Sequence, residues 1–270
     1  MDRERKLLLS LLPFEQEQLK PVFEKQDLCV AEIESLIVSH RSFPDISARL
    51  DSFRNYRVAF CGEDGYPEGL YRLAHPPYRL TSDAPFPSTC GMAVALTCSD
   101  TAYDDVLCCA YGFSRALSFN GISVVLTGEG TCGSRMLAGI AAGGTVPVRV
   151  AGCGLDHCRH RSGVATVSCM EPWMGNSQPG ARRNGATLLV GLASCLVVLQ
   201  ASQRSGSLSC VQEALDSGIE CYVHQCGVDG RMFCRGSKQL FDDGAIMVHG
   251  YEDLARLQGL PMKETCPSGL

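Results

Sequence analysis

Between residues 92 and 257, short apolar runs alternate with longer amphipathic segments. The apolar runs are rich in β-branched residues and bounded by polar ones, as expected of strands buried on both faces. The amphipathic segments repeat apolar residues at helical spacing, as at Val106, Ala110, Phe113 and Leu117. This alternation predicts an α/β fold with a mostly parallel sheet covered by helices on both faces. Ligands of such folds bind at the carboxyl ends of the strands.

The periodicity and its flanking turn residues place the individual elements. The predicted strands are Met92–Thr97, Ile122–Thr127, Val146–Ala151, Val164–Ser168, Cys195–Gln200, Glu220–His224 and Ala245–Val248. The predicted helices are Thr101–Phe119, Gly133–Ala142, Arg183–Leu192, Leu208–Ser217, Lys238–Asp242 and Tyr251–Leu257.

The remaining segments predict a small helical module in front of this α/β domain. Residues 1–60 hold apolar helical runs at 7–12, 14–23, 30–38 and 46–53. Residues 61–90 are rich in proline, glycine and aromatic side chains, which predicts a connector packed on the core. The α/β domain then spans 91–258, and 259–270 form a tail.

One stretch combines a buried strand, a turn and cationic residues. The strand Cys195–Leu199 is followed by the turn Ser205-Gly206-Ser207, which opens an amphipathic helix. A strand, a Gly/Ser turn and a helix N-terminus form a ready anion site, because free N–H groups and the helix dipole both favour negative charge. Upstream, Arg182, Arg183 and Asn184 add guanidinium and amide donors, which indicates a phosphate-bearing ligand.

Two further turns are candidates for the same surface. Gly128, Gly130 and Gly133 form a G-x-G-x-x-G pattern between a strand and a helix, with Arg135 in the first turn of that helix. The alternative reading is a tight turn that needs glycine backbone freedom, with Arg135 on a solvated surface. Lys238, after Gly236 and Ser237, lies in another turn and helix start, although an ordinary capped helix has the same pattern.

The charge distribution changes the meaning of the net charge of −5. Residues 130–240 hold ten Lys and Arg, nine of them Arg, against six Asp and Glu, so the segment with the anion-site candidates is basic. The rest of the chain holds fourteen basic against twenty-three acidic residues. Arginine suits phosphate recognition, although a solvated basic face would give the same counts.

Cysteine is unusually frequent, with 16 residues, and no C-x-x-C pair occurs. Most of the cysteines fall in apolar runs, where a reduced thiol acts as a small hydrophobe. Cys153, His157, Cys158 and His160 are the one metal-like cluster in the sequence. Their spacing is too tight for a structural zinc site without ligands from elsewhere, such as Cys226 or Cys234, so no metal is expected.

The sequence offers little catalytic chemistry. No Ser–His–Asp order, H-E-x-x-H motif or carboxylate pair is found. Glu171 could act as a general acid and Trp173 could stack on a base, but both are more often structural. No apolar run is long enough to span a membrane, and the N-terminus lacks a signal-peptide cleavage site, so we expect a cytoplasmic protein.

Four stretches, in order, resemble the DprA (Smf) family of DNA-processing proteins. The first is Tyr66-Pro67 with Leu70, then Pro76-Pro77 with Leu80, and the second is Gly152-Cys153-Gly154-Leu155-Asp156. The third runs from Arg182 to Leu215 and includes the S-G-S-L turn. The fourth runs from Gly236 to Ala245. Together they cover roughly residues 60 to 250, and four modest motifs in the family's order are fairly specific.

The resemblance implies a Rossmann-like domain after a helical module, without enzymatic activity or a cofactor. It implies a homodimer that binds single-stranded DNA, protects incoming strands and helps load the RecA recombinase during natural transformation. By resemblance, the DNA-contacting surface includes Ser99, Arg182, Arg183, Asn184, Ser205, Gly206, Ser207 and Lys238.

The chain departs from the family pattern at two turns. After the first strand the family has G-S-R, whereas this chain has Cys98-Ser99-Asp100. After the second strand the family's S-G-x-A-x-G-I-D run is replaced by a segment that contains Glu129. Two alternatives therefore stay open. The protein could be a nucleotide-binding enzyme that uses the turn from Gly128 to Gly133, or a relative that has kept the fold but lost DNA binding.

Overall fold

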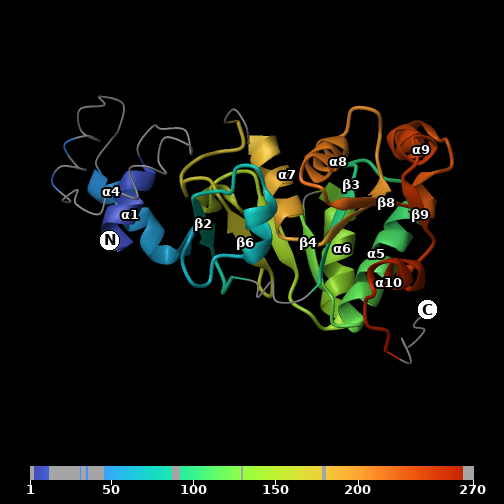
Figure 1. Ribbon diagram of the computed structural model, residues 1–270, viewed down its shortest axis with the longest axis horizontal. Coiled ribbons are helices and arrows are strands. Elements are labelled where there is room, and N and C mark those ends of the chain that lie inside the picture. Colours follow the sequence, from blue (N-terminus) through green and yellow to red (C-terminus); the bar gives the residue numbers. More distant parts are fainter. Residues whose placement is uncertain are drawn as a thin grey trace.

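The computed structural model describes residues 3–11, 31, 35, 46–86, 92–128, 130–177 and 181–263 of the 270-residue chain (Figure 1). Outside these residues lie the predicted helix at 14–23, all of the predicted helix at 30–38 except residues 31 and 35, Glu129, and the end of the predicted tail. The two N-terminal helices whose bounds are defined are α1 (Arg3–Ser10) and α4 (Ile46–Ser52).

A nine-stranded sheet runs through the molecule in the order β1-β2-β6-β5-β4-β3-β7-β8-β9. All pairs from β6 to β9 are parallel, whereas β1–β2 and β2–β6 are antiparallel. The strands are β1 (Arg57–Phe60), β2 (Arg79–Ser82), β3 (Ala93–Cys98), β4 (Ser123–Leu126), β5 (Val148–Ala151), β6 (Ala165–Ser168), β7 (Cys195–Gln200), β8 (Glu220–His224) and β9 (Ile246–Val248). The predicted mostly parallel sheet is confirmed.

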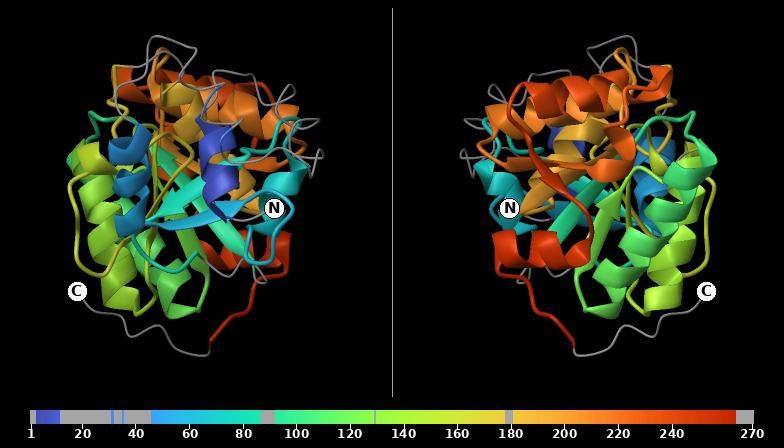
Figure 2. Two further views of the ribbon diagram at one scale, coloured as in Figure 1. Left: turned by 90° about the vertical axis from the view of Figure 1, so that its left-hand side faces the viewer. Right: turned by 90° about the vertical axis from the view of Figure 1, so that its right-hand side faces the viewer.

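Helices cover both faces of the sheet (Figures 1 and 2). One face carries α7 (Ala181–Gly191), α8 (Gly206–Asp216) and α9 (Arg235–Asp242), and the other carries α5 (Asp104–Phe119), α6 (Gly130–Gly143) and α10 (Tyr251–Gln258). Short 3-10 turns are η1 (Phe53–Asn55), η2 (Glu68–Arg72), η3 (Leu155–His157), η4 (Gln225–Gly227) and η5 (Met232–Cys234). None of the described helices is long and apolar enough to cross a membrane.

The central strands are buried on both faces, as their uninterrupted apolar character predicts. In β3, Ala93 and Ala95 pack in the core under α7 and α8, whereas Val94 and Leu96 pack in the core under α5 and α6. The same alternation along β7 divides its side chains between the two cores. Because successive side chains of a strand point to opposite faces of the sheet, each strand contributes to two separate apolar layers.

The segment before β3 differs from the prediction. Arg57–Phe60, at the end of the predicted helical module, form strand β1, and the predicted connector contains strand β2. β2 is buried at all four positions and pairs antiparallel with both β1 and β6, so it extends the sheet. Tertiary pairing thus overrides the local turn-rich composition, which by itself favours irregular structure.

The strand order reverses between β3 and β7. From β3 the chain proceeds outward through β4 and β5 to β6, then crosses back through α7 to β7 on the other side of β3. At such a switch point the connections leave in opposite directions, which opens a crevice at the carboxyl ends of the two strands. The N-termini of the helices that follow the parallel strands face this same edge of the sheet.

Helices α5 and α6 approach each other closely at Gly139. A Cβ atom on Gly139 would lie 2.3 Å from Ser114 Oγ and 2.4 Å from the Tyr111 carbonyl oxygen. The Ser114 hydroxyl also donates across the interface to the Met136 carbonyl, at 3.1 Å. The helix pair therefore has no room for a side chain at this position.

We expect Gly139→Ala to lower the free energy of unfolding by about 1–3 kcal/mol, because the added methyl group forces the two backbones apart. Gly112→Ala is the matched control, since Gly112 lies mid-helix in α5 with nothing within 4 Å of its added Cβ. This control should raise stability by about 0.5–1 kcal/mol, the helix-propensity gain of alanine over glycine. Urea unfolding measures both, and equal effects at the two sites would contradict the close approach.

Candidate functional site

Two loops meet at the switch point, one after β3 and one after β7. Ser99 N–H donates to the Gln200 carbonyl at 2.9 Å, and Ser202 N–H donates to Ser99 Oγ at 2.9 Å. Ser99 is only 5% exposed. The structure thus places Ser99, predicted on the DNA-contacting surface, beneath that surface, where it ties the two loops together.

The Ser205-Gly206-Ser207 turn divides into buried and exposed residues. Ser207 is buried, and its Oγ is 3.1 Å from Thr97 Oγ1, so it anchors α8 to β3. Gly206 is exposed and begins α8. Ser205 occupies the N-cap position, and its Oγ is buried without a hydrogen-bond partner among the described residues. The N–H groups of Ser205 and Leu208 donate to the Ser202 and Ser205 carbonyls, at 3.1 and 3.2 Å. The N–H groups of Gly206 and Ser207, at the first positions of α8, remain as donors for an anion.

Arg182 and Arg183 lie exposed in the first turn of α7, and neither forms an ion pair within the described part of the chain. Asn184 is half-buried, and its Nδ2 donates to Met170 Sδ at 2.7 Å, so it orients the helix start. Between α7 and α8 lies a groove of about 590 Å³, which we call the arginine groove. It is lined by Asn176, Ala181, Arg182, Arg183, Ala186, Ser209, Gln212, Glu213 and Asp216.

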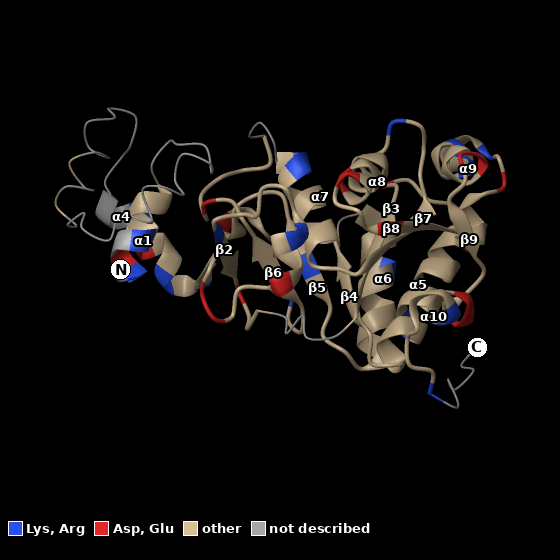
Figure 3. Ribbon diagram, viewed as in Figure 1, with Lys and Arg blue, Asp and Glu red and all other residues tan. Residues whose placement is uncertain are grey.

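The arginine groove contains both signs of charge. In Figure 3 the basic residues colour the N-terminal end of α7 and the acidic residues colour α8 across from it. Glu213 and Asp216 are the acidic lining residues. Arg204, exposed in the turn immediately before Ser205, adds a cation near the start of α8 that the sequence analysis did not select. Arg204 directly precedes the S-G-S-L motif, and this position in the sequence could have identified it as a candidate.

The motif around Lys238 has mainly a structural role. The N–H groups of Gly236 and Ser237 both donate to the Ala201 carbonyl, at 2.8 and 3.1 Å. Ser237 is fully buried, and its Oγ accepts from Ala201 N–H and donates to the Gly227 carbonyl. These N–H groups are therefore not free to extend an anion surface. Lys238 itself pairs with Asp242 at 2.7 Å, one helical turn away.

The glycine turn after β4 lies on the opposite face of the sheet from the arginine groove. α6 begins at Gly130, three residues before the predicted start at Gly133. Gly133 packs against the turn, since a Cβ atom on it would lie 2.6 Å from the Gly128 carbonyl carbon. Arg135 consequently lies in the second turn of α6 and is exposed. A carboxylate oxygen of Asp100 would lie 3.7 Å from a Cβ on Gly130, so negative charge already stands beside the start of α6.

Another cation near the switch point is held by partners. Arg231 bonds both oxygens of Asp105, at 3.1 and 2.7 Å, also contacts Asp229, and stacks 4.0 Å from the centre of the Tyr103 ring. The hydrogen bond from Arg231 lowers the pKa of the Asp105 carboxyl below its usual value. This group ties the loop after β8 to the start of α5.

Two residues with candidate chemistry have structural roles. Glu171 pairs with the buried Arg79 at 3.3 Å, and burial lowers the pKa of the Arg79 guanidinium while Glu171 opposes that change. Trp173 packs edge-on against Phe53, with ring centres 5.8 Å apart, and Arg49 stacks on it at 4.6 Å. Glu171 therefore ties the segment after β6 to β2, and Trp173 packs that segment against the N-terminal helices.

The metal-like cluster of the sequence does not converge. Cys153 Sγ and Cys158 Sγ are 3.6 Å apart, but His157 Nε2 bonds the Trp173 carbonyl at 2.7 Å and His160 faces Asp83 at 3.5 Å. Cys226, considered as an additional ligand, bonds His224 instead.

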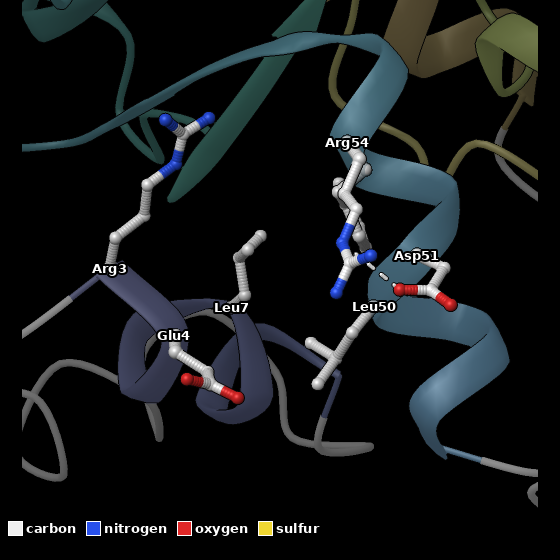
Figure 4. Close-up of a pocket in the computed structure, with 7 residues that line it drawn as sticks. Arg3, Glu4, Leu7, Leu50, Asp51 and Arg54 are labelled. Carbon is white, nitrogen blue, oxygen red and sulfur yellow. Dashed lines mark ion pairs between the residues drawn. The ribbon is translucent and has the colours of Figure 1, made fainter.

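A second hollow lies between α1 and α4 and holds none of the predicted site residues (Figure 4). Its charged lining residues are Arg3, Glu4, Asp51 and Arg54, and Arg54 pairs with Asp51 at 3.1 Å. Charges there are matched within the hollow, in contrast to the unpaired Arg182 and Arg183.

The loops that resemble family motifs also pack closely. A Cβ on Gly152 would lie 2.2 Å from the Ala181 carbonyl oxygen, so the loop after β5 sets the position of the α7 N-terminus. A Cβ on Gly154 would lie 1.9 Å from the Glu171 carbonyl oxygen. Glycine is required at both positions for the backbone to approach.

Comparisons with known proteins agree with this architecture. DprA of Streptococcus pneumoniae superposes with a TM-score of 0.80 over 97% of this chain and 99% of its own, at 18% identity. DNA processing protein A of Helicobacter pylori, described as having a unique single-stranded DNA binding mode, gives a TM-score of 0.62 over 76% of this chain and 98% of its own, at 16% identity. These likenesses establish the Rossmann-like fold. No curated protein matches the chain significantly by sequence.

The family model of DNA recombination-mediator protein A matches residues 57–258. This range contains all four stretches that carry the resemblance, and it begins at β1 and ends with α10. The chain therefore belongs to the DNA recombination-mediator protein A family, DprA.

Proposed function

We propose that this protein binds single-stranded DNA along the arginine groove and acts as a recombination mediator without catalysis. The observation that carries the proposal is the pair Arg182 and Arg183, exposed and unpaired at the start of α7. The proposal is supported by family membership and by the single-stranded DNA binding described for the Helicobacter pylori protein.

In this proposal the protein recognises the phosphates of the strand. The two guanidinium groups neutralise phosphate charge, and the N-terminus of α8 presents the N–H groups of Gly206 and Ser207 to the same backbone. No aromatic side chain is among the residues that line the groove, so stacking on bases contributes little there. Weak sequence preference and strong salt dependence follow.

The contributions of the other predicted residues differ in kind. Ser99 and Ser207 lie in the floor and position the loops, Asn184 orients the start of α7, and Arg204 extends the cationic edge. Lys238 contributes only if a phosphate displaces Asp242 from it. Arg135 and the turn from Gly128 to Gly133 lie across the sheet, so a strand that reached them would have to pass over its edge.

We extend the proposal to the cellular role implied by the family. The protein acts in the cytoplasm as a homodimer, protects incoming single strands and helps load RecA during natural transformation. Exposed apolar side chains on α9 and β9, Phe241 and Ile246, support a self-association surface at that edge of the sheet.

We expect Arg182→Ala/Arg183→Ala to weaken binding of a labelled single strand by about tenfold or more, because two charge-assisted contacts are lost. The slope of log affinity against log salt should become shallower by about 1.4, at about 0.7 per phosphate on single strands. Fluorescence anisotropy over a salt series measures both quantities.

The matched control is Arg54→Ala/Arg256→Ala, which removes the same charge from α10 and the N-terminal helices. It should leave both the affinity and the slope close to those of the wild type. No binding by the wild type at low salt would instead identify a family member that has lost the DNA surface. Stabilisation by a mononucleotide in the same buffer would favour the enzyme alternative.

We also expect Glu213→Gln/Asp216→Asn to tighten single-strand binding by about two- to fivefold at low salt, because two carboxylates no longer repel phosphates in the groove. Asp64→Asn/Glu68→Gln, two exposed carboxylates between β1 and β2, is the control with the same charge change. Equal tightening by both double variants would show that net charge, and not the groove, sets the affinity.

A further inference from the structure

A cluster of thiols and one imidazole lies at the carboxyl edge of the sheet, on the face that α5 and α6 cover. It brings together Cys109 of α5, His224 at the end of β8, and Cys226 of η4. Their Sγ and ring nitrogen atoms all lie within 4.8 Å of one another. Among the described residues, no other group of three or more His, Cys, Asp or Glu side chains converges in this way.

Two more cysteines adjoin this set. Cys109 and Cys226 are hydrogen-bonded through their side chains, and so are Cys98, at the end of β3, and Cys132 of α6. Cys132 is also close enough to Cys226 to interact with it electrostatically. Cys98 and Cys132 therefore lie next to the cluster but are not among the three donors that converge.

The imidazole of His224 lies against the thiols, with its Nδ1 3.0 Å from Cys226 Sγ. Nδ1 also accepts the Cys226 N–H at 3.2 Å, so zinc bound through Nδ1 would replace that hydrogen bond. The ring also hydrogen-bonds to the backbone of His249 and packs edge-on against Phe113, with ring centres 5.3 Å apart. In metal-binding histidines, a hydrogen bond of this kind on the other ring nitrogen fixes the tautomer and the orientation of the ring.

The size of the cluster suits a tetrahedral ion. Zinc bonds of about 2.3 Å to sulfur and about 2.0–2.1 Å to nitrogen place neighbouring ligand atoms roughly 3.4–3.8 Å apart. The observed limit of 4.8 Å therefore needs only small side-chain adjustments. His224 is 3% exposed, whereas the half-buried Cys109 and Cys226 leave a path for the ion.

We propose that Cys109, His224 and Cys226 bind a zinc ion, with the fourth position of the tetrahedron left to solvent. The ion would join α5 to the end of β8. Gly227, the residue after Cys226, accepts the hydrogen bond from Ser237 that seats α9 on the turn after β7. The zinc would therefore stabilise the floor of the carboxyl edge, and this role does not depend on whether DNA binds above it.

The test uses the full chain, purified under reducing conditions with zinc present and then dialysed, with its metal content measured by plasma mass spectrometry. We expect one zinc ion per chain in the wild type and loss of that zinc in Cys226→Ser. Cys108→Ser is the matched control, because Cys108 is the exposed neighbour of Cys109 on α5 and lies outside the cluster. It should retain the zinc.

Cobalt replacement of the zinc supplies a readout that does not depend on folding stability. Tetrahedral thiolate ligation gives intense charge-transfer bands and visible ligand-field bands in the wild type and Cys108→Ser, and these bands should be lost in Cys226→Ser. Circular dichroism of the zinc-free proteins shows whether Cys226→Ser still folds. If it does not, His224→Gln provides the same comparison with all thiols intact.

Three results would overturn the proposal. One is a reduced, folded wild type that holds no stoichiometric zinc, and another is equal zinc content in Cys226→Ser and wild type. The third is a chain without zinc in which intact mass and thiol counting show a disulfide between Cys109 and Cys226. The last result would assign the cluster to redox chemistry.

Discussion

The hydrogen bonds that converge on the turn after β7 hold the carboxyl edge of the sheet together. The Ala201 carbonyl accepts from two N–H groups of α9, and Ser237 Oγ bridges Ala201 and Gly227. From the other side, Ser99 fixes Ser202. Buried backbone groups in a turn must be paired, because an unpaired one costs about as much as a lost hydrogen bond. The loops after β3, β7 and β8 therefore take up one arrangement together, and the start of α8 is held in place above them.

The family motifs in this chain act chiefly through such packing. Gly152 allows the loop after β5 to touch the α7 backbone, and Gly236 lies against the Ala201 and Ser202 carbonyls. Each position excludes a Cβ atom by direct contact with backbone. The motifs set where the N-termini of α7, α8 and α9 stand, whereas the proposed DNA contacts come from exposed residues, above all Arg182 and Arg183. In this chain the residues that fix the backbone and the residues proposed to contact DNA are therefore different.

The positive charge available at the carboxyl edge of the sheet depends more on ion pairing than on the number of basic residues. Of the cations near the edge, Arg231 is held by Asp105 and Asp229, and Lys238 by Asp242. Counts along the chain include all of these as positive charge, but only cations without a protein partner are fully available to a phosphate. Glu213 and Asp216 reduce the field of the groove further. The available charge is thus smaller and more localised than the basic balance of residues 130–240 suggests.

The sequence by itself determined the alternation of elements and the fold class, because strand and helix periodicity are local properties of the chain. It also determined that Ser205, Gly206 and Arg182 stand at helix starts, since turn residues and caps act over a few positions. The starts of α6 and α9 were each predicted three residues too late, and Gly133 and Gly236 lie inside these helices.

Only the tertiary structure decided the rest. β2 forms by pairing with the edge strand β6, and β1 forms by pairing with β2. No local sequence pattern predicts these pairings. Lys238 pairs with Asp242 one helical turn away. Arg135 lies on the other face of the sheet because α6 packs there. Ser99 is buried by contacts between the loops after β3 and β7, which are distant in the sequence. The same holds for Cys109, His224 and Cys226, which no spacing motif connects. Their meeting depends on parallel strands whose carboxyl ends share one edge of the sheet.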